Sequence, residues 1–499
     1  MISLTLPQIA RVTGGRVHPD TTAALDLAVT RSVVTDSRAV EPGSLYVARR
    51  GEHADGHDYL GSAAAHGAVA ALTNRDSDLL PCVVVQEDPT RLSPRPDRPP
   101  YDAVTRAFGA IAREVLDRCV ADGGLRVVGI TGSSGKTSTK DLMAHVLSGL
   151  GPTLAPEASY NSEVGVPLTV CRLTPETAYL VVEMGASGKG HIEHLTGIAP
   201  PQVSVVLNVG TAHLGEFGSR EAIAEAKAEI VRALPAHGLA VLNADDAVVA
   251  AMAAQARAVG ARITLVGLSA AADVRAADVL IDAAGRASFT LHAPEAPADG
   301  IRVGLQLVGE HHVGNALAVA AVAHEWGMPW PDISTALGDA TPQSRWRMEV
   351  TDRADGVTVI NDAYNANPDS MRAALKALAA MRREGGHTVA VVGGMLELGE
   401  TSAAQHLLVG QEAAVLGIDH LVTVGDLAEP AATAYLEHGG AEATSLTDRY
   451  QARDFLTARL TRHDVVLLKS SRDVGLRFLG DDLAGIDPAP AAVDKEVDA

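Results

Sequence analysis

The stretch LRVVGITGSSGKTSTKD, residues 125–141, is the strongest indication of fold and function in this chain. Residues 127–130 form a short apolar run rich in β-branched side chains, which predicts a buried strand. Glycines and serines at 132–135 interrupt that run, and Lys136 opens a predicted helix. A strand, a glycine-rich turn and a helix together form a phosphate site, because backbone N–H groups at the turn and at the helix start converge on an anion.

The glycine-rich turn therefore predicts a nucleotide site. Lys136 would contact the β- and γ-phosphates, and the hydroxyl of Thr137 would ligate Mg²⁺. The strict phosphate-loop pattern has glycine where Ile130 stands, so a plain Gly/Ser turn with a surface lysine is the alternative. The predicted nucleotide-binding residues of this segment are Gly132, Ser133, Ser134, Gly135, Lys136, Thr137 and Ser138.

Composition limits the classes of protein that fit. The chain has 499 residues, too many for one hydrophobic core, so about two to four domains are expected. Hydrophobic residues make up 47% and charged residues 20%, as in a soluble globular protein. The formal net charge of −20 argues against nucleic acid or an anionic membrane as a partner, although a local basic phosphate pocket is compatible with it.

The cysteines and the N-terminal residues indicate the cellular compartment. Cys82, Cys119 and Cys171 lack CxxC spacing and predict neither a disulfide framework nor a zinc site. Residues 1–15 lack a charged region followed by a long apolar core, and no apolar span of about 18 residues occurs. We therefore expect a cytoplasmic protein that does not insert into a membrane.

Residues 1–100 are expected to form a small α/β domain that ends in the proline-dense segment 93–100, a predicted linker. The domain also contains a polar run. Because Asp and Ser favour turns, the residues alone favour ordinary loop chemistry for this run. It comprises Thr35, Asp36, Ser37 and Arg38.

Residues 101–340 alternate between predicted strands and helices, which indicates a mostly parallel sheet covered by helices. Glu183 and Asn208 each stand at the end of an apolar strand, and His213 follows shortly after. Ligands of open parallel sheets bind beyond the carboxyl ends of the strands, so these side chains should share a crevice with Lys136. Oxygen and nitrogen ligands beside a triphosphate suit Mg²⁺.

Lys227 breaks the pattern of its predicted helix, residues 219–234. Helical spacing places it on the same face as Ile223 and Ile230. A lysine among core positions usually extends its amine to water. The alternative is a carbamate formed with CO₂, which would be an anionic metal ligand. The residues alone favour the first interpretation and do not exclude the second.

A second α/β pattern occupies residues 341–486. Strands predicted at 357–360, 387–392, 421–424 and 465–468 each end in a polar or glycine-rich loop, which predicts a Rossmann-like domain. The tail, 487–499, is rich in proline and alanine and then charged, and is expected to be disordered.

Taken together, these stretches resemble the Mur ligase family along nearly the whole chain. TDSR and DAYNANP favour the members that add a dipeptide, and the DNPR signature of the diaminopimelate-adding members is absent. The segments that carry the resemblance are TDSR (35–38), EPGSLYVARRGEHADGHDY (41–59), TGSSGKTSTK (131–140), YNSEVGVPLT (160–169), VVEMGASGKGHI (181–192), LNVGTAHLGEFGS (207–219), AKAEI (226–230), GEHHVGNALA (309–318), SRWRMEV (344–350), NDAYNANPDSM (361–371), GGMLELGE (393–400) and LKSSR (468–472).

The resemblance implies roles for particular residues. Residues 35–38 would hold the uridine diphosphate end of a substrate, and this role replaces the ordinary turn that the residues alone favoured. Lys136, Lys227 and His213 would be catalytic. Thr137, Glu183, His213 and a carbamylated Lys227 would serve Mg²⁺. Asn161 and Ser162 would contact the substrate, where the family usually has paired asparagines and this chain has serine as the second residue. Further nucleotide contacts would come from Asn315, Arg347, Asp362, Tyr364 and Asn365.

The resemblance also implies a reaction. An ATP- and Mg²⁺-dependent ligase would activate the carboxylate of UDP-N-acetylmuramoyl-tripeptide as an acyl phosphate and join it to D-alanyl-D-alanine, acting as a monomer. The alternatives are a related amide ligase, such as a folylpolyglutamate synthase or a paralogue that uses a depsipeptide, and a nucleotide-binding regulatory protein without turnover. The presence of Lys136, Glu183, His213 and Lys227 argues against the last of these.

Overall fold

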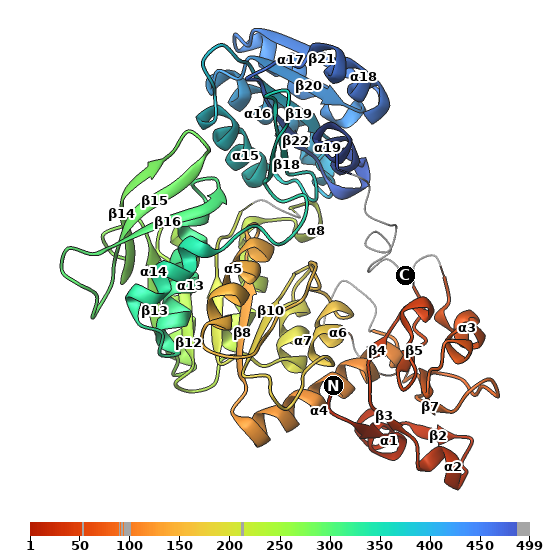
Figure 1. Ribbon diagram of the computed structural model, residues 1–499. Coiled ribbons are helices and arrows are strands. Elements are labelled where there is room, and N and C mark those ends of the chain that lie inside the picture. Colours follow the sequence, from red (N-terminus) through yellow and green to blue (C-terminus); the bar gives the residue numbers. More distant parts are fainter. Residues whose placement is uncertain (52–53, 89, 91–92, 94–100, 211–213, 487–499) are drawn as a thin grey trace.

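The computed structural model describes residues 1–51, 54–88, 90, 93, 101–210 and 214–486 (Figure 1). Each predicted α/β unit has its own main sheet, and the mixed, mostly parallel strand arrangement confirms the expected fold class. The predicted tail at 487–499 and most of the predicted linker lie outside the described residues. No helix within the described ranges is both long and apolar enough to cross a membrane.

The N-terminal unit contains a five-stranded sheet in the order β2-β7-β6-β5-β4 and a short β1–β3 pair. One face of this sheet shares a continuous apolar core with helix α4 (Ala103–Gly123), which leads into the central unit. Its elements are β1 (Leu4–Thr5), α1 (Leu6–Thr13), β2 (Arg16–His18), α2 (Thr22–Leu25), β3 (Ala28–Val29), β4 (Val33–Val34), η1 (Ser37–Ala39), β5 (Leu45–Val47), η2 (Gly56–Tyr59), α3 (Leu60–Ala65), β6 (Ala70–Thr73) and β7 (Cys82–Val84).

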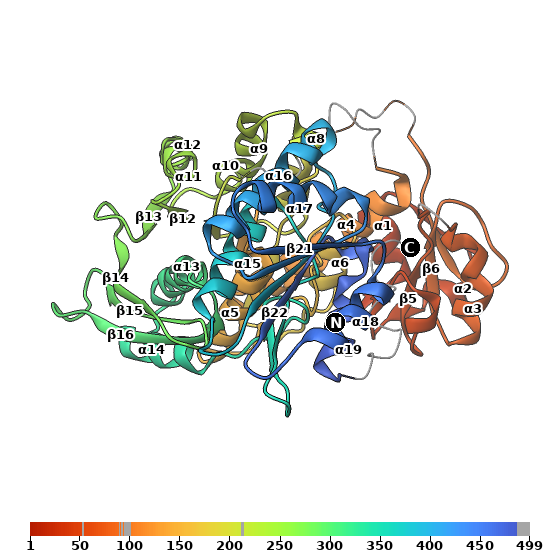
Figure 2. The same ribbon diagram turned by 90° about the horizontal axis from the view of Figure 1, so that it is seen from above.

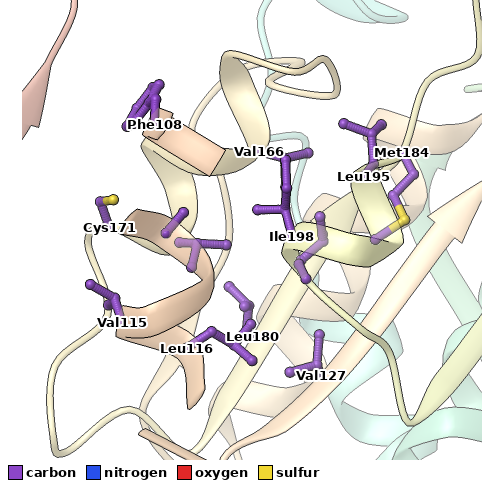
Figure 3. Close-up of a cluster of buried hydrophobic side chains, with 14 of the residues drawn as sticks. Phe108, Val115, Leu116, Val127, Val166, Cys171, Leu180, Met184, Leu195 and Ile198 are labelled. Carbon is purple, nitrogen blue, oxygen red and sulfur yellow. The ribbon is translucent and has the colours of Figure 1, made fainter. Parts of the chain in front are cut away.

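The central unit contains a nine-stranded sheet in the order β16-β15-β14-β13-β12-β11-β8-β10-β9. Strand β8 (Arg126–Thr131) pairs in parallel with both β10 and β11, so the loop after it emerges between their carboxyl ends. The first elements are α5 (Lys136–Ser148), β9 (Thr153–Leu154), α6 (Gly165–Val170), β10 (Tyr179–Glu183), α7 (His191–Ile198), β11 (Val203–Val206) and α8 (Leu214–Phe217). Helices α4, α6 and α7 pack side chains against β8 and β10 (Figure 3).

The predicted helix at 219–234 is divided into α9 (Arg220–Lys227) and α10 (Glu229–Arg232). Ala228, which lies between the two helices, keeps right-handed dihedral angles, φ −66° and ψ −14°, so the backbone stays helical from α9 into α10. Ile223, Lys227 and Ile230 consequently all stay buried, as their helical spacing predicted.

The strict alternation of strands and helices predicted for 101–340 is wrong between residues 274 and 308. Strands β14, β15 and β16 follow one another as antiparallel neighbours without a helix between them. Residues in β16 alternate between buried and exposed, with Val303 and Leu305 facing the core, and this period of two is a strand signal. The remaining central elements are β12 (Leu239–Asn243), α11 (Ala247–Ala251), α12 (Ala253–Ala258), β13 (Arg262–Gly267), β14 (Val274–Ile281), β15 (Arg286–His292), β16 (Ile301–Val308), α13 (His312–Glu325) and α14 (Trp330–Asp339).

The C-terminal unit contains a six-stranded sheet in the order β17-β18-β22-β19-β20-β21, parallel except for the edge strand β17. It sits over the edge of the central sheet at which α5 begins (Figures 1 and 2). Its elements are β17 (Glu349–Asp352), β18 (Thr358–Asn361), α15 (Pro368–Ala380), β19 (Thr388–Gly393), η3 (Gly399–Thr401), α16 (Ser402–Val415), β20 (His420–Val424), η4 (Asp426–Ala428), α17 (Glu429–Glu437), β21 (Glu442–Leu446), α18 (Arg449–Arg459), β22 (Val465–Lys469), η5 (Arg472–Val474) and α19 (Leu476–Ala484).

Candidate functional site

The loop between β8 and α5 has the predicted phosphate-site geometry. Gly135 adopts a φ of +82°, which favours glycine, and directly precedes the first residue of α5. Asn208, just after β11, holds the loop: its Oδ1 accepts hydrogen bonds from the backbone N–H groups of Ser133 and Ser134, each at 2.9 Å. Asn208 therefore fixes the shape of the loop. Of the predicted residues, 132–135 form the turn after β8 and 136–138 form the first turn of α5.

Lys136 folds back over this loop. Its Nζ donates a hydrogen bond to the carbonyl oxygen of Gly132 at 3.0 Å. Burial lowers the pKa of Lys136, the nearby charge of Glu183 opposes that shift, and the guanidinium of Arg347 adds to it. The ammonium thus lies near both the carboxylate of Glu183 and the guanidinium of Arg347, and the two cations beside the loop suit the binding of a polyanion.

Glu183 forms the polar centre of the site. It is the last residue of β10 and only 1% exposed. Its carboxylate accepts hydrogen bonds from Thr137 Oγ1 at 2.9 Å and from Asn161 Nδ2 at 2.6 Å. Ser159 Oγ lies 2.6 Å from Thr137 Oγ1, so it joins the same cluster. The structure therefore brings together Thr137, Glu183 and Asn161, and adds Ser159, which sequence reasoning did not select.

Ser162, the second residue of the predicted asparagine pair, does not contact Glu183 in the described structure. Its Oγ accepts hydrogen bonds from the backbone N–H groups of Val164 and Gly165, at 3.4 and 3.3 Å, at the start of α6. These hydrogen bonds cap the N-terminus of α6. The family resemblance implies asparagine at this position, and the serine hydroxyl has a shorter reach than an asparagine amide.

Lys227 is only 5% exposed. Within the described part of the chain, its amine has no hydrogen bond or ion pair. Burial, together with the positive charge of Lys136, holds the pKa of Lys227 well below its usual value. The side chain is therefore almost wholly buried, whereas the interpretation that the residues alone favoured has it extend its amine to water. The predicted ligand His213 lies outside the described residues.

The C-terminal unit contacts the phosphate loop directly. Asn367 Nδ2 donates a hydrogen bond to the carbonyl oxygen of Ser133 at 3.4 Å. Arg347 Nη2 donates to Ser159 Oγ at 3.0 Å, and its guanidinium carbon lies 4.4 Å from the ring centroid of Tyr364. The site is thus shared between two domains. Asn367 was not among the predicted site residues, although its position before Pro368, at the start of a helix, marks it as a polar cap.

Asp362 and Asn365 lie in the same loop as Tyr364. Asp362 Oδ2 forms an ion pair with the buried Lys469 at 2.6 Å, and its Oδ1 accepts a hydrogen bond from the backbone N–H of Met348 at 3.1 Å. Asn365 is exposed, and its side-chain oxygen accepts a hydrogen bond from the N–H of Ala366. The contacts of Asp362 therefore order the loop that faces the central unit.

A cleft of about 450 Å³ adjoins the phosphate loop. Its size falls in the range typical of small-molecule sites. Asn315 lies in its wall, 6% exposed, and its Oδ1 is 3.1 Å from the position that a Cβ on Gly135 would occupy. The wall comes from both units, with Asn208, Asn243, Asp245 and His311 on the central side and Asp369, Arg372 and Lys376 on α15.

The predicted uridine-binding residues belong to a different part of the molecule. Asp36 caps η1 by accepting a hydrogen bond from the backbone N–H of Arg38 at 2.9 Å, and it also pairs with the Arg38 guanidinium. Ser37 is buried and Thr35 partly exposed. These residues lie in the N-terminal unit, which is apart from the start of α5 (Figure 1). A ligand that contacts both this unit and the phosphate loop must therefore be long.

Three family models match this chain: Mur ligase family, catalytic domain at residues 30–115, Mur ligase middle domain at 130–323, and Mur ligase, glutamate ligase domain at 346–472. The chain belongs to the Mur ligase family, whose members use ATP. It is 45% identical to a Mycobacterium tuberculosis protein named UDP-N-acetylmuramoyl-tripeptide–D-alanyl-D-alanine ligase, an alignment that covers 98% of this chain and 99% of the relative. An Escherichia coli protein of the same name is 37% identical over 87% of this chain and 88% of its own length.

Solved structures agree with this assignment. MurF from Acinetobacter baumannii superposes with a TM-score of 0.83 at 31% identity and covers 97% of this chain and 99% of that one. MurF ligase from Thermotoga maritima in complex with ADP gives a TM-score of 0.76 at 28% identity, with 92% and 98% covered. The family resemblance and the three-domain fold expected from the sequence are therefore confirmed.

Proposed function

We propose that this chain is an ATP-dependent ligase that joins D-alanyl-D-alanine to the free carboxylate of UDP-N-acetylmuramoyl-tripeptide, releasing ADP and phosphate. The names of the relatives that match nearly the whole chain support the choice of substrates, and they favour neither the folate nor the depsipeptide alternative. The observation that carries the chemistry is the meeting of two domains at one phosphate loop, through Asn367 with Ser133 and Arg347 with Ser159.

Each domain takes one reactant in this proposal. Residues 1–100, through Thr35–Arg38, hold the uridine diphosphate end. Residues 101–340 bind ATP, with residues 132–138 around the phosphates and Asn315 at the adenine. Residues 341–486 present the dipeptide and contribute Arg347, Asp362, Tyr364 and Asn365 to the nucleotide side. All these residues belong to one chain, so we propose a monomer, acting in the cytoplasm where ATP and nucleotide-linked sugars are found.

The reaction proceeds in two displacements. A carboxylate oxygen of the tripeptide attacks the γ-phosphorus of ATP, the bond to the bridging oxygen breaks, and ADP leaves. The amine of the dipeptide then attacks the acyl carbon, loses a proton, and expels phosphate. Lys136 offsets the negative charge of the transferring group, where positioning and electrostatics account for most of the catalysis. Contact between the two domains excludes water, which would otherwise hydrolyse the acyl phosphate.

The donor atoms around Glu183 fit a hard divalent cation. Thr137 Oγ1 and the Glu183 carboxylate are 2.9 Å apart, with the oxygen of Ser159 beside them. These are ligands that Mg²⁺ prefers, although within the described ranges no group of three His, Cys, Asp or Glu side chains forms a metal site by itself. Bound Mg²⁺ would neutralise charge on the phosphates, and His213 and the Lys227 carbamate would complete its ligands.

The surroundings of Lys227 support the proposed carbamylation. A neutral lysine amine attacks CO₂, a new N–C bond forms, and one proton is released to solvent. Only the neutral amine reacts, and burial together with the positive charge of Lys136 lowers the pKa of Lys227, which favours the neutral form. The product is an anion, so repulsion from Lys136 becomes attraction.

Mass spectrometry of the reaction products tests the proposed function. The purified chain is incubated with Mg²⁺, ATP, UDP-N-acetylmuramoyl-tripeptide and one of three amine substrates: D-alanyl-D-alanine, D-alanyl-D-lactate or L-glutamate. We expect the pentapeptide product with D-alanyl-D-alanine, in a one-to-one ratio to ADP. A parallel incubation replaces the tripeptide with a folate and uses L-glutamate as the amine substrate. Preferred use of the depsipeptide in the first set, or turnover of the folate in the parallel incubation, would replace this proposal with the corresponding alternative.

A further inference from the structure

Arg347 lies in an unusual stretch of backbone. Its two neighbours, Trp346 and Met348, have φ values of 60° and 50°, the left-handed region that residues with side chains rarely adopt. Both neighbours are 5% exposed. Such conformations persist only where the surrounding structure enforces them, and they are concentrated at functional sites.

Asp481 supplies such enforcement on one side of Arg347. It lies on α19, far along the chain, and is 3% exposed. Both of its carboxylate oxygens lie 3.0 Å from the indole nitrogen of Trp346, which donates to them. Arg345 Nη2 also donates to Oδ1 at 2.8 Å. One buried carboxylate therefore holds the two residues that directly precede Arg347.

The same carboxylate is tied to the sheet of the C-terminal unit. Asn361, the last residue of β18, donates from Nδ2 to Asp481 Oδ1 at 3.2 Å. Gly480 makes this approach possible, because a Cβ there would lie 2.2 Å from Asn361 Nδ2. Asp481 thus joins α19 and β18 to the Arg345–Trp346 segment, and its three donors use most of its acceptor capacity.

The other side of Arg347 is held independently. The N–H of Met348 donates to Asp362 Oδ1 at 3.1 Å, and Asp362 is paired with Lys469. The carbonyl of Trp346 accepts a hydrogen bond from the N–H of Tyr364 at 3.3 Å. Arg347 is therefore fixed at both neighbours, and its guanidinium crosses to Ser159 of the central unit.

We propose that Asp481 is a positioning residue for Arg347: by holding the indole of Trp346 and the guanidinium of Arg345, it keeps the left-handed turn that directs Arg347 across the domain boundary. Asp481 is not among the residues proposed to contact the reactants. The inference rests on the proposed function only in taking Arg347 as a residue of the nucleotide side.

A double-mutant cycle separates this role from a general structural one. The variants are Asp481→Asn, Arg347→Met and the combination, with the exposed neighbour Asp482→Asn as a matched control on the same helix. The affinity for Mg²⁺·ADP is measured by calorimetry, and KM for ATP and kcat by ADP release. Thermal unfolding of each variant is recorded alongside.

If Asp481 acts through Arg347, then Asp481→Asn weakens Mg²⁺·ADP binding about tenfold in the wild-type background and less than about twofold in the Arg347→Met background, as expected of coupled residues. Asp482→Asn leaves the affinity unchanged. Equal losses in both backgrounds, or an unchanged affinity in Asp481→Asn, would overturn the inference.

A second variant covers the case in which Asp481→Asn does not fold. Trp346→Phe keeps the ring and removes only the indole N–H, and it should weaken Mg²⁺·ADP binding about threefold, again only when Arg347 is present. Unchanged affinity in Trp346→Phe contradicts the inference. Binding and ligation are measured separately. A wild type that binds Mg²⁺·ADP with the predicted coupling but makes no pentapeptide would refute the proposed function and leave the role of Asp481 intact, whereas failure to bind Mg²⁺·ADP would refute both.

Discussion

Replacing Lys227 with methionine should separate activity from stability. The change keeps a long apolar stem in a site that is 5% exposed and removes the amine. Without the carbamate, the site loses one preorganised electrostatic group, and such a loss typically lowers kcat about 100- to 1000-fold, or about 2.7–4 kcal/mol. For the uncarbamylated protein, removing a buried amine that has no partner among the described residues should leave the free energy of unfolding unchanged or raise it, because burying such a group costs several kcal/mol.

The pH dependence of stability gives a second prediction for the same variant. In CO₂-free buffer, the lowered pKa of Lys227 means that the native state binds fewer protons than the unfolded state, up to the usual value of 10.5. The free energy of unfolding contributed by Lys227 therefore rises with pH across the window between the lowered pKa and 10.5. Lys227→Met should lose this part of the slope.

The assays are steady-state ADP release, denaturant unfolding at several pH values, and ¹³C NMR of protein equilibrated with labelled bicarbonate. Lys189→Met, an exposed lysine, serves as the control and should change neither activity nor the slope. Acetate should partly restore the smaller Lys227→Ala variant by supplying a carboxylate in the vacated space. Full activity in either Lys227 variant, or the absence of a labelled carbamate in active wild type, would refute the reasoning.

Three further predictions concern the same site. Lys136→Met should lower ligation about 100- to 1000-fold while leaving the unfolding midpoint nearly unchanged, and near-normal turnover would contradict the phosphate-loop assignment. Asn208→Ala should cost about 1–3 kcal/mol in denaturant unfolding and raise KM for ATP, because the N–H of Ser134 loses its side-chain acceptor and the N–H of Ser133 keeps only the backbone carbonyl of residue 208; an unchanged KM would be inconsistent with its holding role. We also expect the apo protein to be more open than the complex with an ATP analogue and both substrates, with a hinge near 338–345, and small-angle scattering without compaction on binding would exclude this motion.

The sequence predicted those parts of the site whose structure depends on residues close to one another in the chain. The apolar run at 127–130 and the glycine-rich turn after it form β8 and the loop before α5, because strand burial and turn chemistry both depend on neighbouring residues. The position of Glu183 at a strand end predicted its nearness to Thr137, since the carboxyl ends of adjacent parallel strands meet at one edge.

The parts that the sequence did not predict depend on long-range contacts. Ser159 and Asn367 are ordinary polar residues in loops, and only folding brings them to Thr137 and Ser133. Spacing put Lys227 on an apolar face but could not say whether its amine reaches water, because that depends on which elements cover α9. The antiparallel strands at 274–308 were missed because the α/β alternation on either side was extended across them, although β16 itself has strand periodicity.

The central claim, ligation through an acyl phosphate, is tested most directly by following an oxygen atom. UDP-N-acetylmuramoyl-tripeptide labelled with ¹⁸O in its terminal carboxylate is incubated with Mg²⁺, ATP, D-alanyl-D-alanine and the enzyme, and the phosphate is analysed by mass spectrometry. Attack of the carboxylate on ATP predicts one ¹⁸O atom in each phosphate released and one retained in the new amide. Phosphate that carries no label while the pentapeptide accumulates would contradict the mechanism.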